Sequence, residues 1–421
     1  MPQPSPPERK TTCIQIDNLN NTPLPAFSLF EFAFRPFFLF AALFSIIHLL
    51  LWVLVWLGKI QLTLPAAGLS PFLWHGHEMV FGYGLAIVIG FLLTAVTNWT
   101  GQKTMIRTPL MLFFCLWLVA RIAFFIGGNG FYVAAIADIT VALWFLVDFT
   151  RPVLQTRNHR QYGFIGKIAA LIFANGLFYL DILGVLPQGI SQGISQGASQ
   201  GVYLGLYLLL AIVLVMGRRV FPFFTKRALG LKNDLKNPYW LDLSSIILFT
   251  IFCLWDVFFT ANHYLALLSV ILFFLYGLRL VNWYGQGLFK HPLIWVLWLA
   301  NAIFFSGFLL KAAAIMGWIN PFLNIHAFAL GGIGLMTLGM MARVSLGHTG
   351  RNVFSPPKIV TPIFILFIMA TFARVVFPLF FAQQYRLWIM LSLMLWAAAF
   401  LLFIISYAKA LITPRVDGKP G

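Results

Sequence analysis

The chain has 421 residues, of which 61% are hydrophobic and 9% are charged, and its mean hydropathy is +0.89. A water-soluble protein needs more polar side chains to cover its surface, so this composition excludes a soluble globular protein. The formal net charge is +17, which could indicate a nucleic-acid partner or a membrane surface. The composition therefore predicts an integral membrane protein, and the placement of the charges decides which partner they serve.

Apolar runs of about 20 residues recur along the whole chain, and each is long enough to cross the hydrocarbon of a bilayer as a helix. Backbone groups inside a bilayer must bond to one another, which favours helices. The sequence therefore predicts an all-α, polytopic helical bundle of about 12 transmembrane helices. The predicted spans are 37–57, 79–97, 109–126, 131–148, 165–186, 202–216, 240–260, 264–282, 293–316, 322–342, 359–381 and 387–412.

The predicted bundle forms one domain, residues 37–412, between a polar N-terminal tail (1–36) and a short C-terminal tail (413–421). No cleavable signal peptide is expected, because no short apolar region with a small-residue cleavage site precedes the first span. The basic loop 217–239 divides the spans six and six, as in two-bundle transporters. The loop 187–201 reads PQGISQGISQGASQG, which predicts a flexible outer linker.

The basic residues fall on one side of the predicted bundle. If the N-terminus is cytoplasmic, only Lys59 and Arg386 fall in outer loops. This asymmetry follows the positive-inside rule, so it predicts that both termini are cytoplasmic and that the partner of the charge is the lipid bilayer, with no nucleic acid. The three cysteines, Cys13, Cys115 and Cys253, form no C-x-x-C, so neither a disulfide nor a covalently attached haem is expected.

Several ionisable residues lie inside the predicted spans, where charge is costly and usually marks a working site. Their predicted depth is the outer half of the bilayer, which indicates a polar interior opening outward. The alternative is structural ion pairing between helices. These residues are Arg121, Asp138, Asp181, Asp256, Lys311 and Arg374.

The stretch SPFLWHGHEM carries two histidines and a glutamate at the start of the second span. Ser70 is a favourable N-cap, and Pro71 suits the first helical position, so a helix is expected to begin before the membrane. Residues two apart on a helix point about 200° apart, so His75 and His77 would serve two neighbouring centres. Alternatively, one is a metal ligand and the other supports it, with Glu78 or a backbone carbonyl fixing the tautomer.

The stretch NPFLNIHAFALGGIG begins in the same way, with Asn320 as the cap and Pro321 as the first helical residue. It places His326 about as deep as His75. Two histidines at matching depth on different helices suit a bis-histidine haem or a haem and copper pair, although histidines of a proton or substrate pathway would look similar. The glycines that follow would admit a flat macrocycle or a packed helix.

The other histidines are weaker candidates for metal ligands. His48, near the middle of the first span, is a further candidate ligand, and His263 falls in a short outer loop. His159 and His291 are expected to be solvated in cytoplasmic loops. His348 follows His326 by about six turns of helix, roughly 33 Å, so it belongs to the cytoplasmic side. There it would order a loop or bind an anion.

Five motifs together resemble the NnrS family. They are FRPFFL (34–39), WHGHEM (74–79), GFLLTAVTNWTG (90–101), RRVFPFFT (218–225) and HAFALGGIGLMTLGMMARVSLGHTGR (326–351). The resemblance implies a bacterial inner-membrane protein that contains haem and copper and acts in the response to nitric oxide and nitrosative stress. Joined to the residue analysis, it makes His75, His77 and His326 the leading metal ligands, with His48 as a weaker one and Glu78 as a supporting group.

Several arginines lie inside these motifs: Arg35, Arg218, Arg219, Arg343 and Arg351. The predicted topology explains them, and contact with haem propionates is the alternative. A haem near the outer face would sooner meet Arg121, Lys311 or Arg374. No soluble cytochrome domain is present, so electrons would come from an unidentified donor or the quinone pool.

Three functions remain open from the sequence. The first is a haem and copper protein that binds nitric oxide or its adducts or converts them as an oxidoreductase. The second is a transporter in which the buried His, Asp and Arg residues couple protons or substrate. The third is a sensor that needs haem but no turnover.

Overall fold

The computed structural model describes residues 27–61, 69–186 and 196–419. It confirms the all-α prediction: this part of the chain has no β-strand and contains 12 helices long and apolar enough to cross a membrane. Cys13 and residues 187–195 of the predicted outer linker lie outside the described ranges, as do most residues of the predicted N-terminal tail.

Each predicted span has a counterpart in the structure. The first six are α1 (Phe34–Trp56), α2–η1–α3 (Pro71–Thr100), α4 (Arg107–Ile126), α5 (Gly130–Gln155), η2–α6 (His159–Ile182) and α7 (Gln196–Leu229). The last six are α8 (Tyr239–Phe258), α9 (His263–Asn282), α10 (Pro292–Ile315), α11–η4–α12 (Pro321–His348), α13–η5–α14 (Val360–Phe380) and η6–α15 (Ala382–Ile412). A short turn, η3 (Leu288–Lys290), precedes α10.

Helix α7 is longer at both ends than the predicted span 202–216. It begins at Gln196, inside the predicted linker, and continues to Leu229, so the first half of the predicted basic loop 217–239 is helical. Lys and Arg are good helix formers, and their long aliphatic stems can lie along apolar surface while the charge reaches water. A hydropathy profile therefore ends this helix too early.

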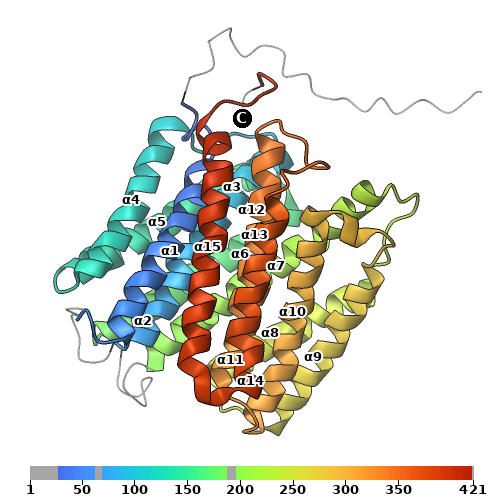
Figure 1. The fold of residues 1–421 in the computed structure, drawn as a ribbon. Helices are drawn as coiled ribbons and strands as arrows, with labels where there is room; N and C mark the ends of the chain where they lie inside the picture. Colours follow the sequence, from blue (N-terminus) through green and yellow to red (C-terminus); the bar gives the residue numbers. More distant parts are fainter. Residues whose placement is uncertain (1–26, 62–68, 187–195, 420–421) are drawn as a thin grey trace, which may run out of the picture.

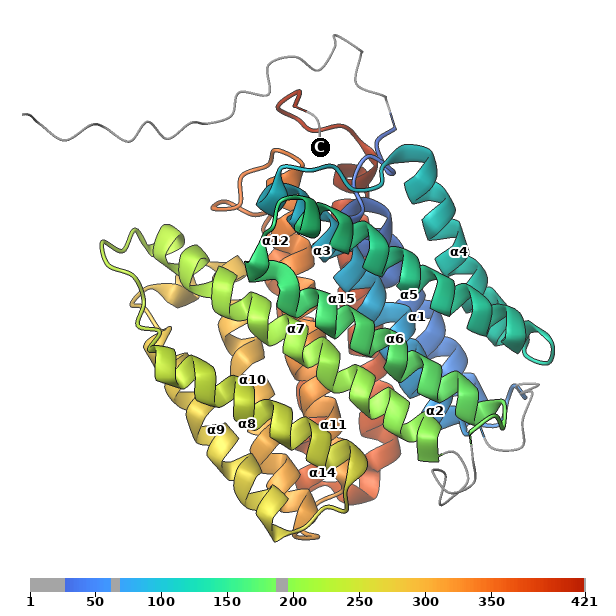
Figure 2. The same cartoon turned by 180° about the vertical axis from the view of Figure 1, so that it is seen from behind.

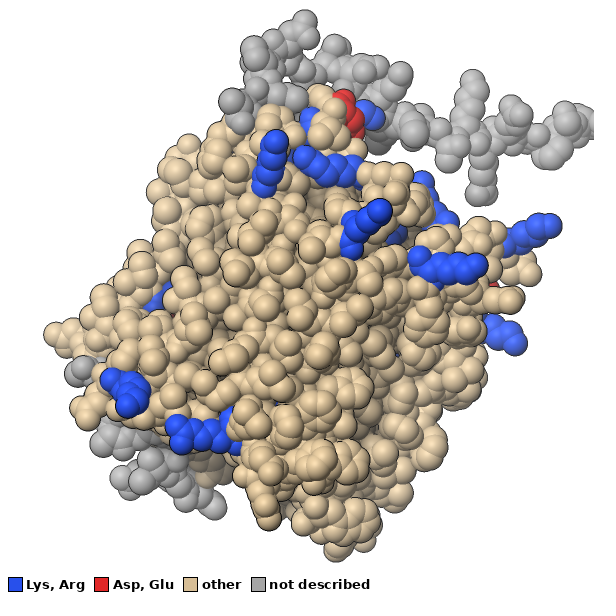
Figure 3. Space-filling model, in the orientation of Figure 1, with Lys and Arg blue, Asp and Glu red and all other residues tan. Residues whose placement is uncertain are grey.

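The two ends of the bundle sequence meet at one end of the molecule. The amide of Ser28 donates to the carbonyl of Ile412 (2.8 Å), and α1 packs against α15. In Figure 1, α1, α15 and α13 run side by side from this terminal end toward the opposite, far end. The view from behind shows α6 and α7 packed together across the other face (Figure 2). Most of the Lys and Arg side chains visible in Figure 3 lie toward the terminal end, and a smaller group lies nearer the far end.

Two spans form the centre of the bundle. In α2–η1–α3 and α11–η4–α12, 83% and 78% of the most apolar stretch is buried, against at most 50% in the other spans. Helix α7 contacts both of them. These two central spans carry the histidine stretches singled out in the sequence, so the histidines lie between helices rather than toward lipid.

The central spans begin as the sequence predicts. The side chain of Ser70 accepts a hydrogen bond from the Leu73 amide (3.2 Å), and Asn320 caps its helix through the Phe322 amide (2.9 Å). Pro71 and Pro321 occupy the first helical turn. Each cap satisfies one free amide of the helix start, which lets both helices begin at the far end, before the apolar core.

Each central span then passes through a π-helical segment, η1 (Glu78–Gly84) and η4 (Ala327–Gly334). Such segments insert an extra residue per turn and are frequent at functional sites. Their glycines serve close packing: a Cβ on Gly331 would lie 2.2 Å from Ile303, and one on Gly84 would lie 2.5 Å from Leu209. The glycines of the second histidine stretch therefore pack against helices.

Candidate functional site

A cavity opens between the starts of the two central spans at the far end of the bundle. It has a wider part of about 600 Å³ and an adjoining, deeper part of about 110 Å³. His75, Met79, His326 and Arg374 line both parts. The remaining walls are mostly apolar, as in cofactor and small-molecule sites, which usually measure roughly 300–1,000 Å³.

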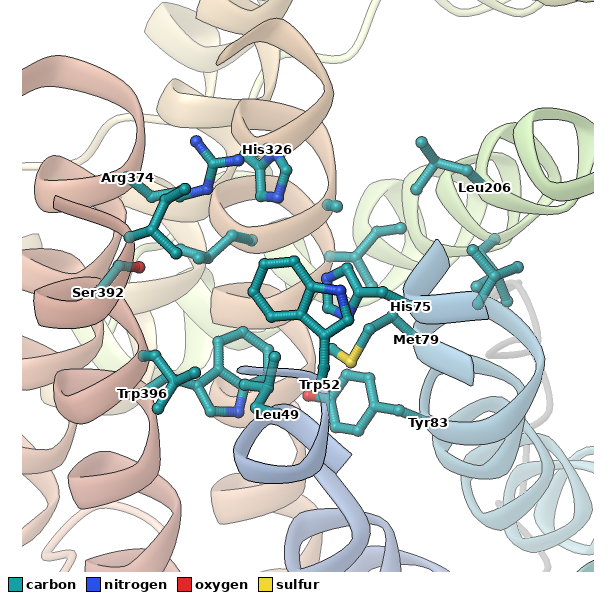
Figure 4. Close-up of a pocket in the computed structure, with 17 residues that line it drawn as sticks. Leu49, Trp52, His75, Met79, Tyr83, Leu206, His326, Arg374, Ser392 and Trp396 are labelled. Atoms are coloured by element: carbon teal, nitrogen blue, oxygen red, sulfur yellow. The ribbon is translucent and has the colours of Figure 1, made fainter. Parts of the chain in front are cut away.

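Figure 4 shows how the polar side chains meet in this cavity. His326 and Arg374 lie beside one another on one side, and His75 and Met79 approach from the other side, with Trp52 between them in this view. The histidines come from α2 (Pro71–His77) and α11 (Pro321–His326), and Arg374 comes from η5 (Phe372–Val376). The structure therefore brings His75 and His326 to one cavity, as their matching depth predicted.

Both cavity histidines are held through the Nδ1 atom of the ring. Nδ1 of His326 lies 2.7 Å from the carbonyl oxygen of Phe322, one turn earlier, and must therefore donate its proton. Nδ1 of His75 lies 3.2 Å from Nε2 of His48. The Nε2 atoms of His75 and His326 have no hydrogen-bond partner among the described residues. This arrangement, with one nitrogen anchored and the other free, is usual for metal-binding histidines.

Arg374 is the cation of this cavity. Its Nη1 donates to the hydroxyl of Tyr385 (2.9 Å), and its guanidinium carbon lies 5.2 Å from the centre of the Tyr385 ring. No carboxylate pairs with it in the part of the chain that the structure describes. A buried guanidinium without an anion favours an acidic group in the adjoining space.

His77 points away from the cavity into a buried polar network. Its Nδ1 lies 2.9 Å from Oε1 of Glu78, and its Nε2 lies 2.9 Å from Oδ1 of Asn175. The ring stacks on Phe178 at a centroid distance of 4.0 Å. Both ring nitrogens are therefore engaged, and the structure does not join His77 to His75 and His326. Glu78 likewise supports His77, rather than the cavity histidines.

The same network contains two of the predicted intramembrane charges, Arg121 and Asp138. Nη1 of Arg121 donates to Glu78 (2.5 Å), and its Nη2 donates to Asp138. The second oxygen of Asp138 accepts a hydrogen bond from the hydroxyl of Tyr179 (2.6 Å). None of these four side chains belongs to a residue more than 4% exposed. Ion pairs join η1, α4 and α5, and hydrogen bonds from Tyr179 and Asn175 add α6. Structural ion pairing was the alternative for these charges.

The other predicted charges are also engaged. Lys311 pairs with Asp256 (2.5 Å), and Asp256 accepts a hydrogen bond from Tyr207 (2.5 Å). Asp181 accepts a hydrogen bond from the amide of Ala198 and so holds the start of α7. Arg374 is therefore the member of the predicted set that faces the histidine cavity.

No group of three His, Cys, Asp or Glu side chains is arranged to hold a metal ion within residues 27–61, 69–186 and 196–419. A metal in the cavity would have to use two histidines, a haem macrocycle, or a ligand of another kind. One candidate of another kind is Met79, which the histidine spacing did not predict. It follows His75 by four residues, so both lie on one helix face, and its sulfur lines the same cavity.

The sequence profile described as NnrS protein matches residues 28–415, which is nearly the whole chain. The chain belongs to the NnrS family. A comparison with curated proteins gave no match.

In this NnrS chain, the motif arginines lie at the terminal end, away from the histidine cavity. Nη1 of Arg35 donates to carbonyls at the end of α15, including those of Leu411 (2.9 Å) and Thr413 (2.8 Å). Arg343 lies over the Phe224 ring, with its guanidinium carbon 3.8 Å from the ring centre. These contacts tie helix ends together.

The remaining motif arginines make similar contacts in the NnrS chain. Arg218 pairs with Asp242 (2.9 Å), and Arg219 donates to Gln161 (2.7 Å). Arg351 donates to the carbonyl of Thr349. The structure therefore places none of the motif arginines beside His75 or His326, and their shared location is the positively charged end that the topology predicts.

The remaining histidines lie outside the cavity. His348 lies at the end of α12, where its ring is 5.5 Å from the Phe34 ring and its carbonyl accepts from Arg415. His159 and His263 are exposed, and His291 is half-buried. Cys115 and Cys253 are both free thiols in the NnrS chain.

Proposed function

We propose that this NnrS protein holds haem and copper in the cavity between His75 and His326 and acts on nitric oxide in the nitrosative-stress response. The observation that carries the proposal is the pair of free Nε2 atoms presented by two central helices to one cavity. The haem and copper implied by the family fit this donor set. The fit comes from ring nitrogens fixed by hydrogen bonds, from apolar walls, and from the Arg374 guanidinium, which pairs with no carboxylate of the described residues.

Each cavity residue has a separate role in this proposal. The Phe322 carbonyl and His48 hold the rings of His326 and His75 so that Nε2 can bind a metal. Arg374 would pair with the carboxylate of a haem propionate, with Tyr385 holding the guanidinium in place. When bound, haem supplies an iron that can take a diatomic molecule as a ligand.

Copper would have soft and borderline donors in the same place. Thioether sulfur and imidazole nitrogen suit Cu(I), and Met79 and His75 offer both kinds. Nε2 of His48 lies 3.2 Å from Nδ1 of His75 and so orients the His75 ring. This proposal uses His48 as a partner of His75 and leaves His77 in the buried network with Glu78.

The membrane setting suits nitric oxide, which is small, uncharged and soluble in lipid, so it can reach a buried cavity without a polar pore. We place the protein in the bacterial inner membrane with the basic terminal end in the cytoplasm, because the positive-inside rule assigns the basic end there. The histidine cavity then faces the periplasmic half of the bilayer. Binding alone or a redox conversion of nitric oxide would both use this site.

The structure removes the main support for the transporter alternative. That alternative depends on buried charges that are available to protons or substrate. Arg121 and Asp138 pair with each other, as do Lys311 and Asp256. Ion pairs of this kind hold helices together, so they supply no specific reason to prefer transport.

The test is an absorption spectrum of the detergent-purified protein, oxidised and reduced, with metal analysis of the same sample. We expect a Soret band that shifts on addition of nitric oxide. His75→Ala and His326→Ala should each lower the haem or copper content, whereas the matched loop variant His263→Ala should keep both. Colourless, metal-free protein from haem-replete cells would refute the proposal.

A further inference from the structure

A second opening lies on the lipid-facing side of the bundle, between α1 and α4. This crevice has a volume of about 230 Å³ and is lined by residues from α1, α2, η1 and α4. Its rim is aliphatic and exposed: Ile47 is 47% and Ile122 is 52% exposed. Because these helices cross the membrane, such a rim faces hydrocarbon, and the crevice is open to molecules dissolved in the bilayer.

The floor of the crevice is polar, unlike its rim. His48, Glu78 and Arg121 line it, and each of these residues is at least 96% buried. Aromatic side chains surround them, with Phe44 stacked on the His48 ring at 5.6 Å and Trp74 edge-on to it at 4.7 Å. An apolar entrance with a hydrogen-bonding floor fits a flat, amphipathic molecule rather than a purely aliphatic chain.

His48 is the floor residue with unused hydrogen-bonding capacity. Its Nε2 faces Nδ1 of His75, and its Nδ1 has no partner among the described residues. If His75 presents Nε2 to a metal, as the proposed function requires, its Nδ1 carries a proton and donates to His48. Nδ1 of His48 then carries the remaining proton of the neutral ring and is a free N–H donor. The inference therefore rests on the proposed function for this tautomer.

We propose that the crevice binds the head ring of an isoprenoid quinone, with one ring oxygen accepting a hydrogen bond from Nδ1 of His48. A quinone enters from hydrocarbon, has a flat ring for the aromatic walls and carries the carbonyl acceptor that His48 lacks. A phospholipid phosphate fits less well, because the guanidinium of Arg121 already bonds to Glu78 and Asp138. An acyl chain would leave the buried donor of His48 unsatisfied.

This site has a functional consequence because His48 also contacts the cavity. One histidine, His48, separates the floor of the crevice from His75, whose Nδ1 is 3.2 Å from His48 Nε2. A quinone on the floor would be the nearest redox carrier to the proposed metal site. The crevice therefore supplies a position for an electron donor that dissolves in the membrane.

The test measures equilibrium binding of decylubiquinone to the full-length protein in detergent by calorimetry. His48→Phe removes the donor, and Ile122→Trp fills the entrance. The matched control is Val119→Trp, which adds the same side chain to the lipid-facing surface of the same helix at a residue that does not line the crevice. For His48→Phe we expect binding that is weaker by about tenfold or more, which is the loss expected for one buried hydrogen bond. Ile122→Trp should weaken binding at least as much, because the ring blocks the entrance. The control should bind quinone as the wild type does.

A fourth variant, His48→Asn, tests the hydrogen bond itself, because the amide can donate in place of the ring and should restore part of the affinity. No saturable binding to the wild type, equal binding by all variants, or equal displacement by dodecane would overturn the inference. Haem content is measured on the same samples. Wild-type protein that binds quinone but shows no Soret band would refute the proposed function alone. Wild-type protein that shows the Soret band but binds no quinone would refute the quinone site alone.

Discussion

His48 and His75 lie with their rings parallel, 3° apart in orientation and 5.4 Å apart between centres, and their facing nitrogens are 3.2 Å apart. His48 comes from the middle of α1 and His75 from the start of α2. The contact joins a residue on the lipid-facing crevice to one on the central cavity. It makes His48 the residue whose replacement should affect both places.

His48→Phe should weaken the metal site without abolishing it. The aromatic ring keeps the packing against Phe44 and Trp74 but removes the nitrogen that orients His75. Loss of such a supporting partner typically lowers metal affinity about 10–100-fold. Haem and copper content should be measured during competition with a haem-binding protein and a copper chelator. Retention as tight as in the wild type would contradict the supporting role of His48.

Arg374→Gln should weaken haem binding through the propionate. A hydrogen bond to a charged group contributes about 1.5–3 kcal/mol, so we expect roughly a tenfold or greater loss of affinity. Haem dimethyl ester, which lacks the carboxylates, gives the matched comparison. The wild type should prefer haem over the ester, and the variant should bind both alike. An undiminished preference in the variant would show that Arg374 does not meet the propionate.

Arg121→Leu should destabilise the bundle. The guanidinium pairs with both Glu78 and Asp138, and its removal leaves these buried carboxylates without their arginine partner. Breaking a buried pair in this way costs about 3–5 kcal/mol. Thermal unfolding in detergent should show a lower melting temperature, whereas Arg386→Leu, at an exposed arginine, should change it little. An unchanged melting temperature for Arg121→Leu would contradict a structural role for the network.

Gly201→Ala should weaken the packing of α6 against α7. A Cβ at Gly201 would lie 2.4 Å from the Ala174 carbonyl oxygen and 3.0 Å from the Phe178 amide, and backbone atoms cannot move aside like a side chain. Overpacking of this kind typically costs about 1–3 kcal/mol. Gly176→Ala, in α6, is the control, since nothing lies within 4 Å of the added atom.

The control variant should be neutral or stabilising, because alanine favours the helix more than glycine does. The pair is compared by the melting temperature of the detergent-solubilised protein. Equal melting temperatures for the two variants would show that α6 and α7 can separate at no cost.

The starts of the two histidine helices could be predicted residue by residue. Ser70 and Asn320 cap them, with Pro71 and Pro321 following, because a cap is a contact between neighbours in the chain. The end of α7 could not be predicted from hydropathy, since the polar residues beyond 216 continue the same helix. Helix propensity and packing decide that boundary, and neither produces an apolar run.

The charges inside the spans show the same limit. The cost of burying charge predicts that Arg121, Asp138, Lys311 and Asp256 are inside the bundle, and they are. It does not predict their partners, because Arg121 and Asp138 come from different helices. Tyr179 and Tyr207, which complete the two groups, carry no charge and gave no signal in the sequence.

The sequence by itself determined that this is an all-α membrane protein with about 12 spans, where most of these spans begin and end, and that His75 and His326 lie at matching depth. These properties depend on the length of apolar runs and on contacts between residues close in the sequence, so the order of the residues is enough to predict them. Only the tertiary structure decided that these two histidines share a cavity with Met79 and Arg374, and that His77 belongs to an ion-pair network. Those facts depend on how each helix is rotated and packed against its neighbours, and helix packing in a membrane is set by side-chain fit between segments far apart in sequence.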